Sequence, residues 1–136
     1  MRIMKINNIK IEKDFSWIWL LNKKVENFDE TNKRITGKYL FFSKNKKKLI
    51  KLAEVILEKF KLIKAKVPSS SKPIGDEFAL CIYDIEPRFK LELRDYADEK
   101  EIKYRYWKSD EDTLKGRSSE RFLNNLSPEE RRLWTT

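Results

Sequence analysis

The chain has 136 residues, and its 31 Lys and Arg outnumber 22 Asp and Glu to give a formal net charge of +9. This length fits one domain with a single core, for which a hydrophobic content of 40% is sufficient. The sequence has no His, which excludes serine-type triads, the usual zinc sites and ordinary His acid-base catalysis. The basic surplus favours an anionic partner, although many small basic proteins use such charge for solubility alone.

The cysteine content and the hydropathy of the sequence indicate the cellular compartment of the protein. Cys81 is the only cysteine and lies in the apolar run FALCIY, so the chain can form no internal disulfide, as suits a reducing cytosol. No apolar stretch approaches the roughly 18–20 residues that span a bilayer, and the first residues show no secretory signal. We expect a cytoplasmic protein with no membrane contact. The Lys-rich and Glu-rich composition is compatible with a thermophilic source, but an AT-rich genome gives the same bias.

The first part of the chain predicts strands. Residues 2–12 alternate between apolar and polar side chains, as in a strand or a short hairpin. Residues 15–21, FSWIWLL, predict a second strand with Trp17 and Trp19 on one face. The polar residues 22–38 predict a loop with one helical turn near residues 24–28.

The best helix follows a short strand. Residues 38–42 predict the strand, and Ser43 is the expected N-cap of the helix. Apolar side chains then recur at spacings of three and four over residues 49–60, which predicts an amphipathic helix of about 16 residues on a sheet. Lysines fill its first turn, where the helix dipole prefers negative charge. These lysines are either solvated or the binding site of a phosphate at the helix end.

Two more strands and a helix are expected next. Residues 62–67 alternate, with Lys64 and Lys66 on one face, and residues 77–84 predict a central strand because both faces are apolar. Pro87 suits the first turn of a helix that extends to about Glu99. The alternative is a strand over the sequence KLELRDY.

The last strand of the body is predicted over residues 101–108. Its alternation places Lys103, Arg105 and Trp107 on one face, and Ile102, Tyr104 and Tyr106 on the other. Ser127 and Pro128 then predict the start of a short C-terminal helix. The elements together predict an α+β fold in one domain over residues 1–136, with a helical tail at 118–136.

Basic and aromatic side chains meet if the predicted strands share a sheet face. Lys64 and Lys66 project from one strand, and Lys103, Arg105 and Trp107 from another. Such a surface suits RNA or a nucleotide, because cations contact phosphates while a ring stacks on a base. The alternative is an ordinary solvent-facing sheet, whose polar positions are often Lys and Arg.

Motifs for catalysis or metal binding are missing from the sequence. It contains no P-loop, GxGxxG, CxxC or HExxH pattern, and no carboxylate pair stands out as hydrolytic. Asp110, Glu111 and Asp112 are adjacent and lack the separated positions of a cation site, so we expect a turn or a helix cap there. We therefore expect no metal ion and no cofactor.

Short motifs in fixed order resemble the small family typified by the basophilic-leukaemia-expressed protein, which is found in archaea and eukaryotes. They lie within about residues 15–117 and read WIWL, GKYLFFS, IKAKVPSSS, EFALCIYDIEP and IKYRYWKSDEDTLKGR. The positions that carry the resemblance are Trp17, Gly37, Lys38, Tyr39, Ala65, Lys66, Val67, Trp107, Lys108, Asp110, Thr113 and Gly116.

The resemblance implies a fold and a kind of site. The family is similar in fold to the mRNA-cap-binding translation initiation factor, which implies a curved, mainly antiparallel sheet with two main helices on its convex face. Lys64, Lys66, Lys103 and Arg105 would then lie on the concave face. A cap-type site stacks a base between two Trp rings, for which Trp17, Trp19 and Trp107 are the candidates.

The same family has been likened to phosphothreonine lyases, which eliminate phosphate with a Lys base and a His acid. This chain departs from that pattern because it has no His. An enzyme here would need Lys66 or Lys38 as the base and a Tyr or Lys as the proton donor.

Three functional hypotheses follow from the sequence. The leading one is a non-enzymatic domain that binds RNA, a nucleotide or another phosphorylated small molecule. The others are a phosphate-eliminating or phosphodiester-cleaving enzyme centred on a Lys, and a protein-interaction module that blocks a nucleic-acid-handling complex. The candidate ligand-binding residues are Lys38, Lys64, Lys66, Lys103, Arg105, Trp17 and Trp107, and none is assigned as catalytic.

Overall fold

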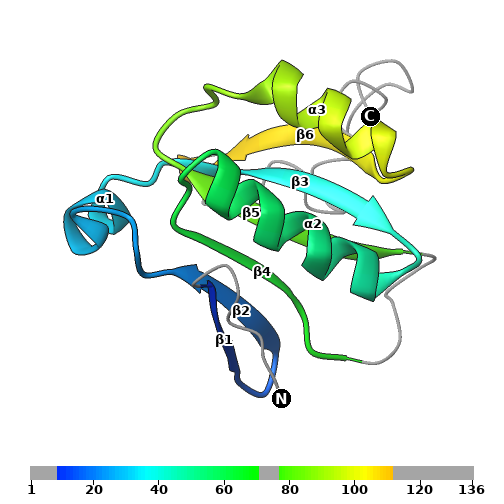
Figure 1. Ribbon diagram of the computed structural model, residues 1–136, viewed down its shortest axis with the longest axis horizontal. Helices are drawn as coiled ribbons and strands as arrows, with labels where there is room; N and C mark the ends of the chain where they lie inside the picture. The colour runs from blue at the N-terminus through cyan, green and yellow to red at the C-terminus, as the bar shows by residue number, and fades with distance from the viewer. Residues whose placement is uncertain (1–8, 71–76, 112–136) are drawn as a thin grey trace.

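A curved, six-stranded antiparallel sheet forms the body of the computed structural model, which describes residues 9–70 and 77–111 (Figure 1). In space the strands lie in the order β1-β2-β4-β5-β3-β6, so β5 is central, as its sequence predicts. Their bounds are β1 (Ile9–Lys13), β2 (Trp17–Asn22), β3 (Gly37–Ser43), β4 (Lys64–Pro68), β5 (Phe78–Asp84) and β6 (Lys103–Ser109).

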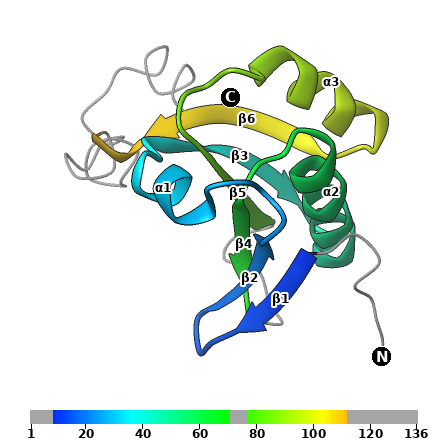
Figure 2. The same ribbon diagram turned by 60° about the vertical axis from the view of Figure 1, so that its left-hand side comes forward.

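Two longer helices cover one face of this sheet. They are α2 (Lys46–Lys59) and α3 (Lys90–Glu99), and both lie on the same side of the strands (Figure 2). A six-residue helix, α1 (Phe28–Lys33), forms part of the connection from β2 to β3. The α+β class and the helices on one sheet face are confirmed, and residues 90–99 adopt the helix rather than the alternative strand.

The main core lies between the sheet and these two helices. Alternate strand residues face α2, so that Leu20, Tyr39, Phe41, Leu80 and Ile82 are fully buried, because successive side chains of a strand point to opposite faces. Each fully buried side chain of this size contributes about 1.5–3 kcal/mol relative to its exposed state. From the helices, the buried residues are Leu49, Leu52, Ala53, Ile56, Leu57, Leu93 and Ala97.

The predicted faces of β6 are wrong for Tyr106 and Trp107, which lie on the opposite faces to those expected. A register shift between Leu40 and Phe41 places Tyr104 opposite Phe41 and Trp107 opposite Tyr39, so both aromatic rings join the main core. The ring of Trp107 packs edge-on against Tyr39, with 5.0 Å between centroids. A β-bulge adds one residue to a strand and so reverses the alternation beyond it.

Two local predictions are also corrected. The N-cap of α2 is Asn45, whose side chain accepts a hydrogen bond from the backbone N–H of Lys48, whereas Ser43 still belongs to β3. The helical segment in residues 22–38 is α1, which starts at Phe28. The predicted C-terminal helix at Ser127 lies outside the described residues. No helix in the described part of the chain is long and apolar enough to cross a membrane.

Candidate functional site

Lysines gather on the sheet face that is turned away from α2 and α3, here called the distal face. Lys38 on β3 and Lys64 and Lys66 on β4 are each partly buried there, and Lys108 on β6 lies beside them as the strand partner of Lys38. β5 lies between β3 and β4, where Cys81 pairs with Lys66 and Tyr83 pairs with Lys38. We call Lys38, Lys64 and Lys66 the lysine cluster. The sequence predicted the shared face of Lys64 and Lys66, and the topology adds Lys38.

Aromatic rings lie around this cluster. The ammonium of Lys66 is 3.9 Å from the ring centre of Trp17 and 5.3 Å from that of Trp19. The ammonium of Lys64 is 5.1 Å from the ring centre of Tyr83, and that of Lys38 is 5.7 Å from the same ring. Such cation–π contacts favour the ammonium groups by about 0.5–1 kcal/mol each at exposed sites. The rings therefore hold the lysine side chains close to the sheet.

None of the lysine cluster's members forms an ion pair among residues 9–70 and 77–111, although Asp110 favours the charge of Lys64 and Asp14 that of Lys66 from a longer distance. Burial lowers the pKa of Lys64, and the neighbouring charge of Lys66 lowers it further. Burial likewise lowers the pKa of Lys66, with a further decrease from Lys38. The ammonium groups of the cluster therefore repel one another on a partly desolvated surface. A bound anion would stabilise them.

Cys81 and Tyr83 form the floor of the cluster on β5. Both are buried in a second apolar group on the distal face, together with Leu40. Burial raises the pKa of the Cys81 thiol, an effect that the nearby lysines only partly offset, so the thiol is not activated as a nucleophile. The ring of Tyr83 stacks on Trp19 with 6.2 Å between centroids.

A turn at residues 14–16 orients the tryptophans of β2. The carboxylate of Asp14 accepts hydrogen bonds from the backbone N–H groups of Ser16 and Trp17, and a longer one of 3.3 Å from the indole N–H of Trp19. The pKa of Asp14 lies below its usual value, mainly because the carboxylate accepts the hydrogen bond from the Trp17 N–H. Asp14 thus fixes both the turn and one ring of the site.

The other predicted ligand-binding residues lie elsewhere. Arg105 forms an ion pair of 2.8 Å with Glu77 and packs over Phe42, and Lys103 is exposed opposite Phe42. Phe42 is four residues from Lys38 along β3, or about 13 Å. Trp107 packs in the main core. The structure therefore groups Lys38, Lys64, Lys66 and Trp17, and separates Lys103, Arg105 and Trp107 from them.

Two residues of the site were not predicted to belong to it. Tyr83 shares a strand face with Cys81 in the run EFALCIYD, but only the pairing of β5 with β3 and β4 places it between lysines. Asp14 precedes an aromatic strand, and the Asp-x-x-Trp spacing of an Asx-type turn is the signal in the sequence that could have revealed its role.

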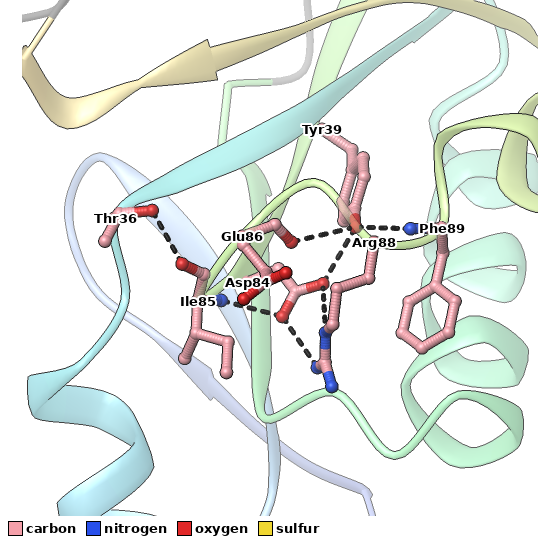
Figure 3. Close-up of polar contacts among 7 residues, drawn as sticks. All are labelled: Thr36, Tyr39, Asp84, Ile85, Glu86, Arg88 and Phe89. Carbon is pink, nitrogen blue, oxygen red and sulfur yellow. Dashed lines mark hydrogen bonds and ion pairs between the residues drawn. The ribbon is translucent and has the colours of Figure 1, made fainter.

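A polar network lies on the helical side, at the other face of β3 and β5 (Figure 3). The Tyr39 hydroxyl donates to Asp84 at 2.8 Å and accepts from the backbone N–H of Phe89 at 3.0 Å. Asp84 is 3% exposed and pairs with Arg88 at 2.8 Å. Since every member has a partner within the fold, the network anchors the segment before α3 and offers no unused group to a ligand.

A groove of about 850 Å³ runs between α2 and α3. Its lining mixes apolar side chains such as Val55 and Tyr96 with both Lys and Glu residues. Burial raises the pKa of Glu54 on its wall. Because the charges of both signs alternate there, the groove shows no preference for an anion, unlike the distal face.

Comparisons with known proteins return no match. No family model matches the chain, and neither a curated protein nor a solved structure is similar to it by these searches.

Within the described residues, no group of three or more Cys, Asp or Glu side chains could hold a metal ion.

Proposed function

We propose that the distal face binds a phosphate-bearing ligand, either a free nucleotide or the nucleotides of RNA, without catalysing a reaction. The observation that carries this proposal is the lysine cluster, in which three partly buried lysines share a surface and form no direct ion pair among the described residues. Phosphate oxygens would supply the missing negative charge, and their attraction is stronger in a partly desolvated site than in bulk water.

The aromatic residues favour a nucleotide over other phosphorylated molecules. Trp17, Trp19 and Tyr83 lie beside the ammonium groups, so a base could stack while its phosphate contacts a lysine. The ammonium of Lys66 now covers the ring of Trp17, and it would leave the ring for the phosphate as the base takes its place. This mode of binding agrees with the cap-binding type of fold that the motif resemblance to the basophilic-leukaemia-expressed family implies.

The test is a titration with fluorescent single-stranded RNA and with a labelled nucleotide at 50 and 200 mM salt. Three phosphate contacts to a single strand predict that the RNA affinity falls by roughly 20-fold between the two salt concentrations. Lys38→Gln, Lys64→Gln and Lys66→Gln should each weaken binding and reduce this salt dependence. Lys51→Gln, at an exposed lysine of α2 that borders the groove on the helical side of the sheet, is the matched control and should leave both unchanged. Absence of binding at 50 mM salt would overturn the proposal and direct the search to a protein partner.

A second candidate, a lyase-like enzyme centred on Lys66, is favoured by one observation. The lowered pKa of Lys66, caused mainly by burial, suits a base that removes a proton from carbon while a neighbouring C–O bond breaks and phosphate leaves. Lys66→Arg keeps the positive charge but removes this base. If the native protein releases phosphate from a phosphothreonine peptide and Lys66→Arg does not, while both bind RNA or peptide equally, the enzymatic function replaces the binding function.

A further inference from the structure

The turn between β1 and β2 exposes an aromatic ring completely. Phe15 is 100% exposed, and it is the only aromatic residue among the exposed large hydrophobic side chains in the described part of the chain. The others, Ile11, Val55 and Leu91, are 37–63% exposed. The β1–β2 hairpin projects away from α2 and α3, so the turn stands at the edge of the molecule (Figure 1). One exposed apolar residue is ordinary in a folded protein, so exposure alone carries no function.

The backbone of this turn is held in place by several hydrogen bonds. The Asp14 carboxylate accepts from the N–H groups of Ser16 and Trp17, and the Asp14 N–H donates to the Trp17 carbonyl at 2.9 Å. From the end of β4, the Ser69 hydroxyl donates to the Phe15 carbonyl at 2.7 Å, and the Ser69 N–H donates to the Ser16 carbonyl at 3.0 Å. Phe15 is therefore displayed from a fixed backbone.

The ordered backbone under Phe15 lowers the entropic cost of binding a ligand. A ring on an ordered backbone has only two side-chain torsions to fix, so little conformational entropy is lost when a flat ligand stacks on it. The same turn also positions Trp17, whose ring lies under the ammonium of Lys66. Phe15 thus precedes Trp17, one of the aromatic residues beside the lysine cluster, by two residues and lies in the turn before β2.

The distances set the size of the ligand. Trp17 pairs with Pro68 and Leu21 pairs with Lys64, so β2 runs along the whole length of the lysine-bearing strand. Four strand residues from Trp17 to Leu21 span about 13 Å, and Phe15 lies past the Trp17 end of this line, in the turn that precedes β2. One nucleotide is too short to contact Lys64 and Phe15 together, whereas a single strand of several nucleotides can reach both.

We propose that Phe15 is the outer stacking platform of the distal-face site, and that the ligand is therefore a single-stranded oligonucleotide of RNA rather than a mononucleotide. Its phosphates contact the lysine cluster, and a base beyond them stacks on Phe15. This inference rests on the proposed function and adds to it the class of ligand and the direction in which it lies.

The experiment compares an RNA of about eight nucleotides, within the usual site size of a small single-strand-binding domain, with a mononucleotide. Phe15→Ala should weaken binding of the eight-nucleotide RNA by about 5- to 100-fold and leave mononucleotide binding unchanged. Phe15→Trp should restore the RNA affinity, because it restores a stacking ring. Leu91→Ala, on the helical side, is the control for loss of an exposed apolar side chain and should have no effect.

Each other outcome overturns the inference in a recognisable way. If the native protein binds RNA with the expected salt dependence but Phe15→Ala binds it equally well, the lysine cluster stands and the stacking platform is wrong. If Phe15→Ala weakens mononucleotide binding as much as RNA binding, the ligand is not extended. If the native protein binds neither ligand at 50 mM salt, the proposed function and this inference fail together, and Phe15 is then a candidate contact for a protein.

Discussion

At the residue scale, Gly37 makes room for the indole ring of Trp107. A Cβ atom at position 37 would lie 2.5 Å from Cζ2 of Trp107 and 2.7 Å from the carbonyl oxygen of Lys108. Gly37→Ala should therefore lower the free energy of unfolding by about 1–3 kcal/mol, as overpacking does, measured by urea denaturation. In a Trp107→Phe background the penalty should be smaller, because the smaller ring leaves space. An unchanged stability of Gly37→Ala would contradict the packing described for β3 and β6.

The Tyr39 hydroxyl supports the segment that leads into α3. Tyr39→Phe removes the donor to Asp84 and the acceptor of the Phe89 N–H, so it should cost about 1–3 kcal/mol of stability. Tyr96→Phe, at a partly exposed position on α3, is the control and should change stability little. Equal effects of the two variants in thermal or urea unfolding would show that the network does not stabilise the fold.

At the scale of one element, the first turn of α2 has lysines and no acidic residue. Lys46 is used structurally, since its ammonium donates to the carbonyl of Pro68 at 3.1 Å, and Lys48 pairs with Glu101 at 3.6 Å. Lys47 is exposed and opposes the helix dipole. Lys47→Glu should raise the stability by about 0.3–1 kcal/mol at low ionic strength, and less in high salt.

Lys47→Glu also tests whether the lysines in the first turn of α2 are solvated or bind a phosphate, the two roles that the sequence leaves open. If α2 begins with a solvated lysine run, Lys47→Glu leaves RNA binding unchanged while stability rises. A large loss of affinity in Lys47→Glu, with a smaller loss in Lys47→Gln, would place the phosphate at the start of α2 instead of on the distal face.

Strand β4 carries two lysines whose charge the fold disfavours. Because their pKa values are lower in the folded chain than in the unfolded chain, the unfolded state binds more protons between those values, and stability contributed by these groups rises with pH there. The penalty is complete below the folded pKa values and disappears toward the ordinary value of about 10.4.

The double variant Lys64→Met and Lys66→Met should therefore be at least as stable as the native protein at pH 7, and its advantage should shrink as the pH rises toward about 10.4. It should also lose affinity for RNA. Urea denaturation at several pH values measures the difference. A double variant that is clearly less stable at pH 7 would mean that the cation–π contacts outweigh burial and repulsion, and that the cluster is structural.

At the scale of the whole molecule, local patterns predict most of the elements but not all of the contacts among them. Alternation in residues 62–67 correctly separates Lys64 and Lys66 from the buried Ala65 and Val67, because β4 pairs regularly with β2. The same reasoning fails in β6, since the register shift opposite Leu40 and Phe41 depends on pairing with β3 and leaves no mark in the alternation.

The distal-face site, too, was predictable from the sequence only within single strands. Alternation places Trp17 with Trp19 on one face of β2 and Lys64 with Lys66 on one face of β4, but only the pairing of β2 with β4 brings the two pairs together. The placement of Lys38 and Tyr83 beside them follows from strand order, which brings together segments far apart in the sequence. The separation of Lys103 and Arg105 follows from their positions along β6, and a local pattern cannot show which ends of two strands meet.

The central claim is that the ligand lies on the distal face, and mapping RNA binding by NMR tests it most directly. Adding an eight-nucleotide single-stranded RNA to the labelled protein should shift the indole N–H signals of Trp17 and Trp19 and the side-chain signals of Lys38, Lys64 and Lys66. The amide signals of α2 on the helical side of the sheet, such as that of Lys51, should remain in place. Shifts confined to α2 and α3, or no shifts at 50 mM salt, would contradict the account.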